Sequence, residues 1–139
     1  MSGRGYVPGE LLGRLVGRRL NAVVFSMDVV MLWFDGDERG SGNVTLHCDY
    51  PPEVEYRGVR RRERDAGYAD ALRRLIPEEV TGTVEKTGTG LVVRFASGRL
   101  VIHPSREERW GYEIATLSGF ADRSWMCWRP GEDGFEDLA

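Results

Sequence analysis

The sequence has no glutamine, a single lysine (Lys86) among its 19 basic residues, and only two cysteines, Cys48 and Cys127. The arginine bias is more readily explained by the GC-rich genome of a bacterium than by function. Two cysteines so far apart predict free thiols in a reducing compartment. No apolar run approaches the roughly 18 residues of a membrane-spanning helix, and the N-terminus lacks the apolar core of a secretory signal. We therefore expect a cytoplasmic protein without membrane contact.

Motifs that identify a catalytic or cofactor site are also missing. There is no CxxC or HxxxH spacing and no specific nucleotide-binding or nucleophile motif. The sequence therefore predicts no cofactor and no metal, and it favours a protein without enzymatic activity. A length of 139 residues, a net charge of -3 and a hydrophobic content of 41% are typical of one soluble globular domain, which we place at 1–139.

An internal repeat is the most informative feature of the chain. Residues 41–47 (SGNVTLH) return as residues 97–103 (SGRLVIH), and both histidines of the protein occupy the same place in the two copies. Upstream, residues 30–34 correspond to residues 91–95. Each copy of such a strand-turn-strand unit can bury its apolar face only against its partner. We assign the repeat to about 15–50 and 79–104.

The periodicity predicts mainly strands. One helix is expected at about 65–76, where Tyr68, Leu72, Leu75 and Ile76 form an apolar stripe and Asp65 offers a cap. A short helix is also expected at 9–16, and an acidic tail covers 130–139. We expect an α+β, β-rich fold with two related antiparallel β units, seven to eight strands and one central helix. The expected strands are 20–25, 29–34, 43–48, 80–86, 91–96, 99–103, 112–117 and 124–129.

The two histidines are candidates for chemistry. His47 and His103 would form a metal-binding or catalytic pair if the repeat brought them together, with Cys48 adjacent as a further ligand. Their spacing follows no metal motif, and strand-end histidines held by backbone hydrogen bonds are the more common case. A structural role is therefore favoured, and His47 and His103 are kept as the catalytic candidates.

A cluster of arginines is the candidate binding segment, and it is flanked by two tyrosines that could stack on bases. Arginines of this kind neutralise phosphates, but nucleic-acid-binding domains are usually basic overall, whereas the pI here is about 5.5. An acidic protein surface is the partner that this balance favours, because arginine forks bind carboxylates bidentately. The cluster consists of Arg57, Arg60, Arg61, Arg62 and Arg64.

The C-terminal tryptophans supply a second candidate contact. Trp125 and Trp128 fall on opposite faces of one strand because the side-chain period of a strand is two. One of them is therefore expected to point away from the core, beside Arg129, where it would anchor a partner.

Three segments resemble small uncharacterised actinobacterial domains of unknown function: residues 15–20 (LVGRRL), 25–36 (FSMDVVMLWFDG) and 125–131 (WMCWRPG). The resemblance implies a β-rich, two-repeat fold and supplies no catalytic residues. Some small proteins of this general kind serve as immunity or accessory proteins in bacterial conflict and biosynthetic loci.

We therefore predict a non-catalytic protein-binding module, with an immunity or accessory role by analogy. Two alternatives remain open: an enzyme or metal-binding protein that uses His47 and His103, and nucleic-acid binding through residues 57–64.

Overall fold

The computed structural model describes residues 7–37, 42–108 and 113–130. Within these residues it has two short helices, α1 (Glu10–Gly13) and α2 (Tyr68–Arg73), and a 3-10 turn, η1 (Arg106–Glu108). The strands are β1 (Leu20–Ser26), β2 (Val29–Phe34), β3 (Val44–Cys48), β4 (Glu53–Tyr56), β5 (Val59–Arg61), β6 (Gly82–Lys86), β7 (Gly90–Arg94), β8 (Gly98–Ile102), β9 (Ala115–Ser118) and β10 (Met126–Trp128).

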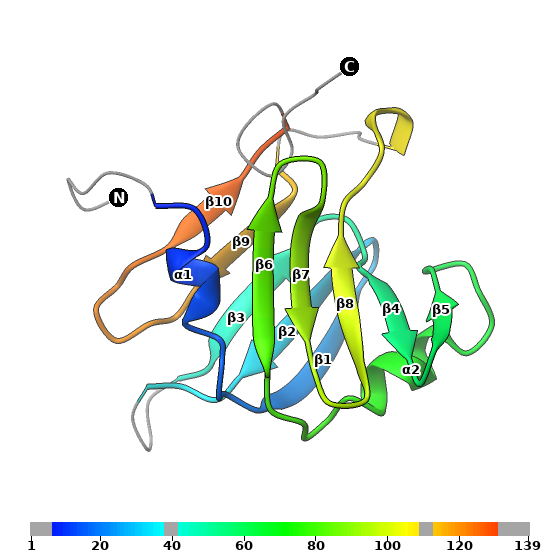
Figure 1. Cartoon of the computed structure of the whole chain (residues 1–139), viewed down its shortest axis with the longest axis horizontal. Helices are drawn as coiled ribbons and strands as arrows, with labels where there is room; N and C mark the ends of the chain where they lie inside the picture. Colours follow the sequence, from blue (N-terminus) through cyan, green and yellow to red (C-terminus); the bar gives the residue numbers. More distant parts are fainter. Residues whose placement is uncertain (1–6, 38–41, 109–112, 131–139) are drawn as a thin grey trace.

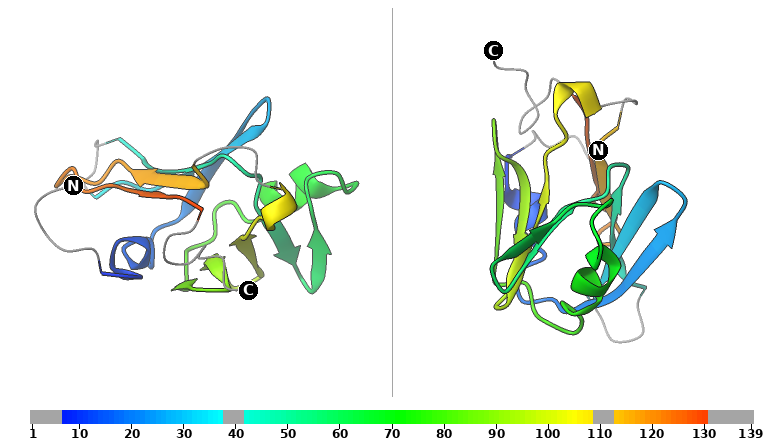
Figure 2. Two further views of the ribbon diagram at one scale, coloured as in Figure 1. Left: turned by 90° about the horizontal axis from the view of Figure 1, so that it is seen from above. Right: turned by 90° about the vertical axis from the view of Figure 1, so that its right-hand side faces the viewer.

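The strands form two five-stranded antiparallel sheets that lie face to face (Figure 1, Figure 2). The first sheet has the order β1-β2-β3-β9-β10 and the second the order β5-β4-β8-β7-β6. The helices sit at opposite sides of this sandwich. The expected β-rich fold with two related antiparallel units is confirmed. Within the described residues it contains ten strands instead of seven to eight, since β4 and β5 were not expected, and two helices instead of one, since each unit has a helix of its own.

The two copies exchange their last strands. The first copy runs from α1 through β5 and the second from α2 through β10. In each copy the first three strands pair in order, β1-β2-β3 and β6-β7-β8. The following hairpin then joins the other copy's sheet: β4 pairs with β8, and β9 pairs with β3. Each sheet is therefore completed by the opposite copy.

An approximate twofold axis relates the copies where the chain leaves each helix. The N–H of Leu20 donates to the carbonyl of Glu78 at 3.0 Å, and the N–H of Val80 donates to the carbonyl of Arg18 at 2.9 Å. The two bonds are equivalent, because Val80 follows Leu20 by 60 positions and Glu78 follows Arg18 by the same number. Arg19 and Glu79 form an antiparallel bridge between them. The equivalence thus reaches further upstream than residues 15 and 79 and includes the helices.

The strands that carry the two histidines are equivalent, but the histidines are not. Leu32 in β2 pairs with Leu46 in β3, and Val93 in β7 pairs with Leu100 in β8. Leu46 therefore corresponds to Leu100, and His47 corresponds to Val101. The sequence match places His47 on His103, whereas the strand pairing places it on Val101, two residues earlier. The turns before β3 and β8 differ in length, so the matching Ser-Gly and His residues do not occupy equivalent positions. Ser41 lies outside the described residues.

The core lies between the sheets and follows the alternation of each strand. Val30, Leu32 and Phe34 of β2 and Leu100 and Ile102 of β8 are buried, and they belong to one hydrophobic cluster with side chains from both sheets and both helices. Both cysteines are free and buried.

Helix α2 carries the expected apolar stripe but is shorter than 65–76. Tyr68, Leu72 and Leu75 are buried. Gly67, with φ of +84°, is the N-cap residue, and no side chain caps the helix. The expected cap, Asp65, instead accepts the backbone N–H of Arg62 at 2.8 Å and so closes the preceding turn.

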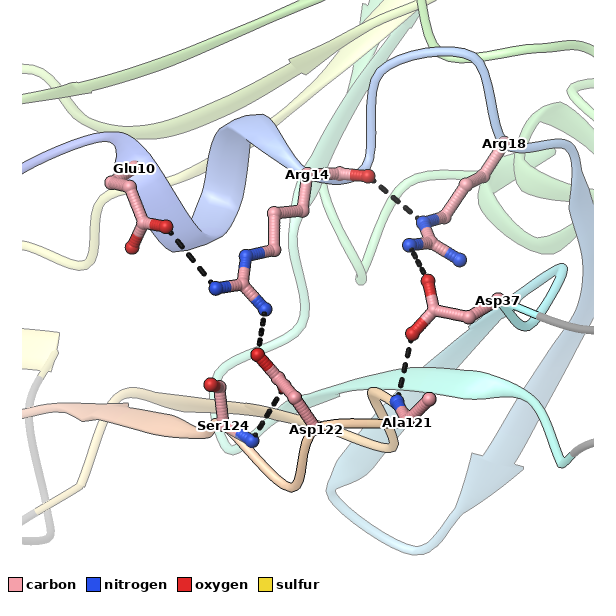
Figure 3. A network of polar contacts seen from close by, with 7 residues as sticks. All are labelled: Glu10, Arg14, Arg18, Asp37, Ala121, Asp122 and Ser124. Atoms are coloured by element: carbon pink, nitrogen blue, oxygen red, sulfur yellow. Dashed lines mark hydrogen bonds and ion pairs between the residues drawn. The ribbon is translucent and has the colours of Figure 1, made fainter. Parts of the chain in front are cut away.

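Helix α1 is tied to two loops by arginines (Figure 3). Arg14 bonds Glu10 at 3.2 Å and Asp122 at 2.9 Å. Arg18 bonds Asp37, whose other carboxylate oxygen accepts the backbone N–H of Ala121 at 2.7 Å. These contacts join the first copy's helix to the β9–β10 loop of the second copy.

The second helix repeats this arrangement. Arg74 bonds Asp70 at 2.7 Å, as Arg14 bonds Glu10 one turn earlier in α1. Both arginines also lie over an aromatic ring of the opposite copy: the distance is 5.2 Å from Arg14 to the centre of Phe120 and 6.0 Å from Arg74 to the centre of Tyr56. The two helix contacts are therefore related by the same approximate symmetry.

Candidate functional site

The arginine cluster lies on the β4–β5 hairpin and in the turn after it, and its members point in different directions. Arg57 occupies the hairpin turn with φ of +49° and lies over the Tyr56 ring. Arg61 pairs with the core residue Val54, and its guanidinium lies against Gly67 at the start of α2. The remaining three members, Arg60, Arg62 and Arg64, line one pocket.

This pocket, which we call the arginine pocket, has a volume of about 540 Å³ and opens on the outer face of the second sheet. Four segments surround it: the turn before β4, the β5 region, strands β7 and β8, and the chain after β8. Its lining residues are Tyr50, Pro51, Glu53, Arg60, Arg62, Glu63, Arg64, Thr89, Val92, Arg99, Val101, Ile102, His103, Pro104 and Glu108.

The floor of the arginine pocket is apolar. Val92 and Val101 are paired neighbours on β7 and β8, and their row faces away from the core. Val92 is nevertheless only 4% exposed and does not belong to the main core cluster. Tyr50 and Pro104, also in the lining, are buried as well. Val101, which is partly exposed, is therefore the residue through which the floor presents apolar surface.

The rim of the pocket is charged. Arg60 contacts Glu53 at 2.9 Å, and Arg99 bonds Glu55 at 2.7 Å. These pairs follow from strand pairing, because β4 lies between β5 and β8 and presents Glu53 and Glu55 on the outer face. Arg–carboxylate pairs at a surface contribute about 1 kcal/mol or less to stability, but they orient the guanidinium groups.

Two further arginines act on Glu108. Its carboxylate accepts the backbone N–H of Ser105 at 2.9 Å, and the Arg62 guanidinium lies 3.8 Å away. The hydrogen bonds from Ser105, assisted by the charges of Arg62 and Arg64, hold the pKa of Glu108 below its usual range. Glu108 is therefore a carboxylate at neutral pH.

The lining has a small excess of positive charge. It contains four arginines and three glutamates, so that it carries about one positive charge, whereas the whole chain has a net charge of -3. The pocket is thus richer in arginine than in carboxylates, and Glu55, which pairs with Arg99, lies just outside the lining. Such a local excess attracts and orients an anionic group without general attraction to polyanions.

The structure does not bring the two candidate histidines together. His103 lines the arginine pocket on the second sheet. His47 is paired with Met31 and Thr116 on the outer face of the first sheet, so the core separates the two imidazoles. Within the described ranges no group of three or more His, Cys, Asp or Glu side chains is arranged to hold a metal ion.

The neighbours of His47 form no thiolate site. Cys48 points into the core, where burial raises the pKa of its thiol far above the ordinary value. Asp49 lies 3.5 Å from the His47 ring. Burial raises the pKa of Asp49, the charge of Glu113 adds to this, and His47 opposes it. A protonated thiol in the core is a poor nucleophile and a poor metal ligand.

Neither tryptophan candidate is among the lining residues of the arginine pocket. Trp128 is 1% exposed and packs in the core, so it offers no surface to a partner. Trp125 is 47% exposed and Arg129 is also exposed, which confirms that one tryptophan points away from the core. They flank β10, an edge strand of the first sheet, whereas β5 is an edge strand of the second sheet, on the opposite side of the molecule (Figure 1).

Sequence reasoning missed several residues of the pocket, including Arg99, Glu53 and Val92. Alternation in β8 indicates that Arg99 faces outward when Leu100 faces the core. The pairing of β4 with β8 joins segments more than 40 residues apart and leaves no local signal in the sequence.

Comparisons with protein-family models, curated proteins and solved structures found no match to this chain. No helix of the described part of the chain is long and apolar enough to cross a membrane.

Proposed function

We propose that this protein is a non-catalytic binding module that uses the arginine pocket and its rim to bind an acidic surface of another protein. The observation that carries the proposal is the gathering of Arg60, Arg62, Arg64 and Arg99 around one concave site in a chain of net charge -3. Arginine is enriched at protein interfaces and binds carboxylates through two parallel hydrogen bonds.

The geometry favours a protein partner over nucleic acid. Single-stranded nucleic acid binds through aromatic rings on which bases stack. Tyr68 is buried, and its hydroxyl donates to the carbonyl of Pro52. The Tyr56 ring is already covered by Arg57 and Arg74, at 5.4 and 6.0 Å. Neither tyrosine that flanks the cluster therefore supports the stacking alternative.

The separation of His47 and His103 on different sheets likewise supports a binding role over the alternative of a paired-histidine site. We propose a cytoplasmic setting and, by analogy at the level of fold alone, an immunity or accessory role in a bacterial conflict or biosynthetic locus.

Charge reversal in the pocket tests the proposal. The double variant Arg62→Glu/Arg64→Glu is compared with the matched control Arg73→Glu/Arg94→Glu, which changes the net charge equally but replaces exposed arginines outside the pocket lining. Each immobilised protein captures ligands from a lysate of the organism that encodes it, and captured proteins are then purified and measured individually.

We expect an acidic protein that binds the wild type and the control but not the pocket variant. Its association rate is expected to fall with added salt, because rim charges steer the encounter. Duplex and single-stranded nucleic acid are titrated in parallel. Sub-micromolar nucleic-acid binding at physiological salt, abolished by the pocket variant, would contradict the proposal.

A further inference from the structure

The arginine pocket has a feature that a simple acidic contact leaves unused: its apolar floor. The outer face of the second sheet is otherwise strongly charged, with Arg94, Arg99, Glu55 and Arg60 in one cross-strand row. Val92 and Val101 form part of the neighbouring row together with Glu53. Val101 is partly exposed and Val92 beside it is 4% exposed, so that the pocket offers a small apolar contact next to charged residues.

Some arginines on the rim above this floor are not fully engaged by contacts within the protein. Arg60 and Arg99 are each held by a glutamate at 2.9 and 2.7 Å, whereas the contact from Arg62 to Glu108 is long, at 3.8 Å. Arg64 is exposed, and its charge acts on Glu108 together with that of Arg62. The donors of Arg62 and Arg64 are therefore available for a carboxylate.

Floor and rim together resemble the centre of a protein interface. Interfaces draw most of their binding energy from a few apolar or aromatic anchors in pockets, with charged groups around them. A volume of about 540 Å³ accommodates a large side chain together with parts of its neighbours.

We infer that the partner inserts an aromatic side chain onto Val92 and Val101, and that carboxylates on the residues flanking it pair with Arg62 and Arg64. This inference rests on the proposed function and specifies it: the recognised element is an acidic segment with a central aromatic residue. The apolar anchor supplies affinity and the carboxylates supply orientation.

Two synthetic peptides, capped at both ends, test the inference with the full-length protein. The first has the sequence Gly-Glu-Asp-Phe-Glu-Asp-Gly and the second has alanine in place of phenylalanine, so that their charges are equal. We expect the alanine peptide to bind about tenfold more weakly or worse, because burial of a phenylalanine side chain favours binding by this order. Equal affinities would overturn the inference.

A variant that fills the floor gives the second test. Val101→Trp places a large side chain over the pocket floor, and the matched control His47→Trp alters the equivalent position on the outer face of the first sheet. Val101→Trp is expected to weaken the phenylalanine peptide to the level of the alanine peptide, while His47→Trp leaves both unchanged. Circular dichroism verifies that both variants fold. Retention of full binding by a folded Val101→Trp protein would overturn the inference.

The rim variant separates this inference from the proposed function. If Arg62→Glu/Arg64→Glu weakens both peptides while Val101→Trp weakens neither, the acidic contact stands and the aromatic anchor is overturned. If neither variant affects peptide binding and the captured partner is also retained, both proposals fail.

Two further binding measurements test whether the pocket holds something other than a separate protein partner. Competition by free phenylacetate at the concentration of the peptide would assign the pocket to small aromatic acids and overturn the peptide inference. Residues 132–137 (EDGFED) of the chain itself combine the same groups. Tighter peptide binding by Phe135→Ala would assign the pocket to this segment and would overturn the inference of a separate partner.

Discussion

The stability of the fold depends on the protonation state of two aspartates near α1. Arg14 and Arg18 each lie 5.2 Å from the centre of the Phe120 ring, and each also bonds an aspartate of another loop (Figure 3). The backbone N–H of Ser124 and then Arg14 lower the pKa of Asp122 to about 2. The backbone N–H of Ala121 and then Arg18 lower the pKa of Asp37. Both aspartates therefore favour the folded state as carboxylates.

We predict that acid weakens the fold through these groups. A carboxyl whose pKa is depressed in the folded state stabilises the protein above its unfolded pKa, and this contribution disappears as the pH falls through the folded value. The free energy of unfolding is expected to fall between about pH 4 and pH 2. Urea melts across this range measure it, and Asp122→Asn is expected to fall less steeply than the wild type. Asp28→Asn, in the β1–β2 turn, is the control and is expected to follow the wild type.

Residue by residue, the sequence predicted part of the candidate site. It identified Arg60, Arg62, Arg64 and His103, which the structure places in one pocket. It could not separate these arginines from Arg61, because the strand β5 that turns neighbouring side chains to opposite faces was not anticipated. The alternation of side chains between the two faces can be used for prediction only where a strand has been recognised.

At the level of elements, the β4–β5 hairpin decides where the site lies. Its alternation of Val54 and Tyr56 with glutamates, followed by Arg57 and Gly58, is the pattern of a two-residue turn. Arg57 and Gly58 indeed have φ of +49° and +82°. This signal was available, but the surrounding arginine run resembled a solvated loop. The other eight strands lie within or close to the expected ranges. β9 and β10 are shorter than the expected 112–117 and 124–129, and residue 112 lies outside the described part of the chain.

Glycine at the start of β8 allows the hairpin to pair there. A Cβ built on Gly98 would overlap the carbonyl oxygen of Glu55 in β4. We predict that Gly98→Ala lowers the free energy of unfolding by about 1 to 3 kcal/mol, the range of overpacked sites. Gly42→Ala, where a Cβ would meet nothing within 4 Å, is the control. A loss at position 98 no larger than that of the control would show that the hairpin shifts freely.

The two helices offer equivalent core positions for comparison. Leu12 of α1 and Leu72 of α2 are both 0% exposed and stand 60 residues apart. We predict that Leu12→Ala and Leu72→Ala each cost about 2 to 5 kcal/mol in urea melts. Met27→Ala, at a side chain that is 98% exposed, is expected to change stability by no more than about 0.5 kcal/mol. A comparably small loss at either leucine would place that helix face in solvent.

At the scale of the whole molecule, the two sheets share one strand arrangement but differ in the residues on their outer faces. The second presents Arg99, Glu55 and Arg60 in one row, whereas the first presents Trp33, Thr45 and Ser118 in the equivalent row. The repeat was visible in the sequence, but the exchange of hairpins was not, since long-range pairing leaves no periodicity. The arginine pocket depends on that exchange, because β4 and β5 come from one copy and β7 and β8 from the other.

The exchange of hairpins also makes the chain a natural candidate for fragment complementation. Cleavage between Ala66 and Gly67 separates the copies, and each fragment then lacks the strands that complete its sheet: β3 loses β9, and β8 loses β4. We predict that fragments 1–66 and 67–139 are each unstable alone and reassemble into a 1:1 complex when mixed, as measured by circular dichroism and sedimentation. A fragment that unfolded cooperatively as a monomer would contradict this. Because the arginine pocket exists only in the reassembled complex, peptide binding would report on whether the two halves have met.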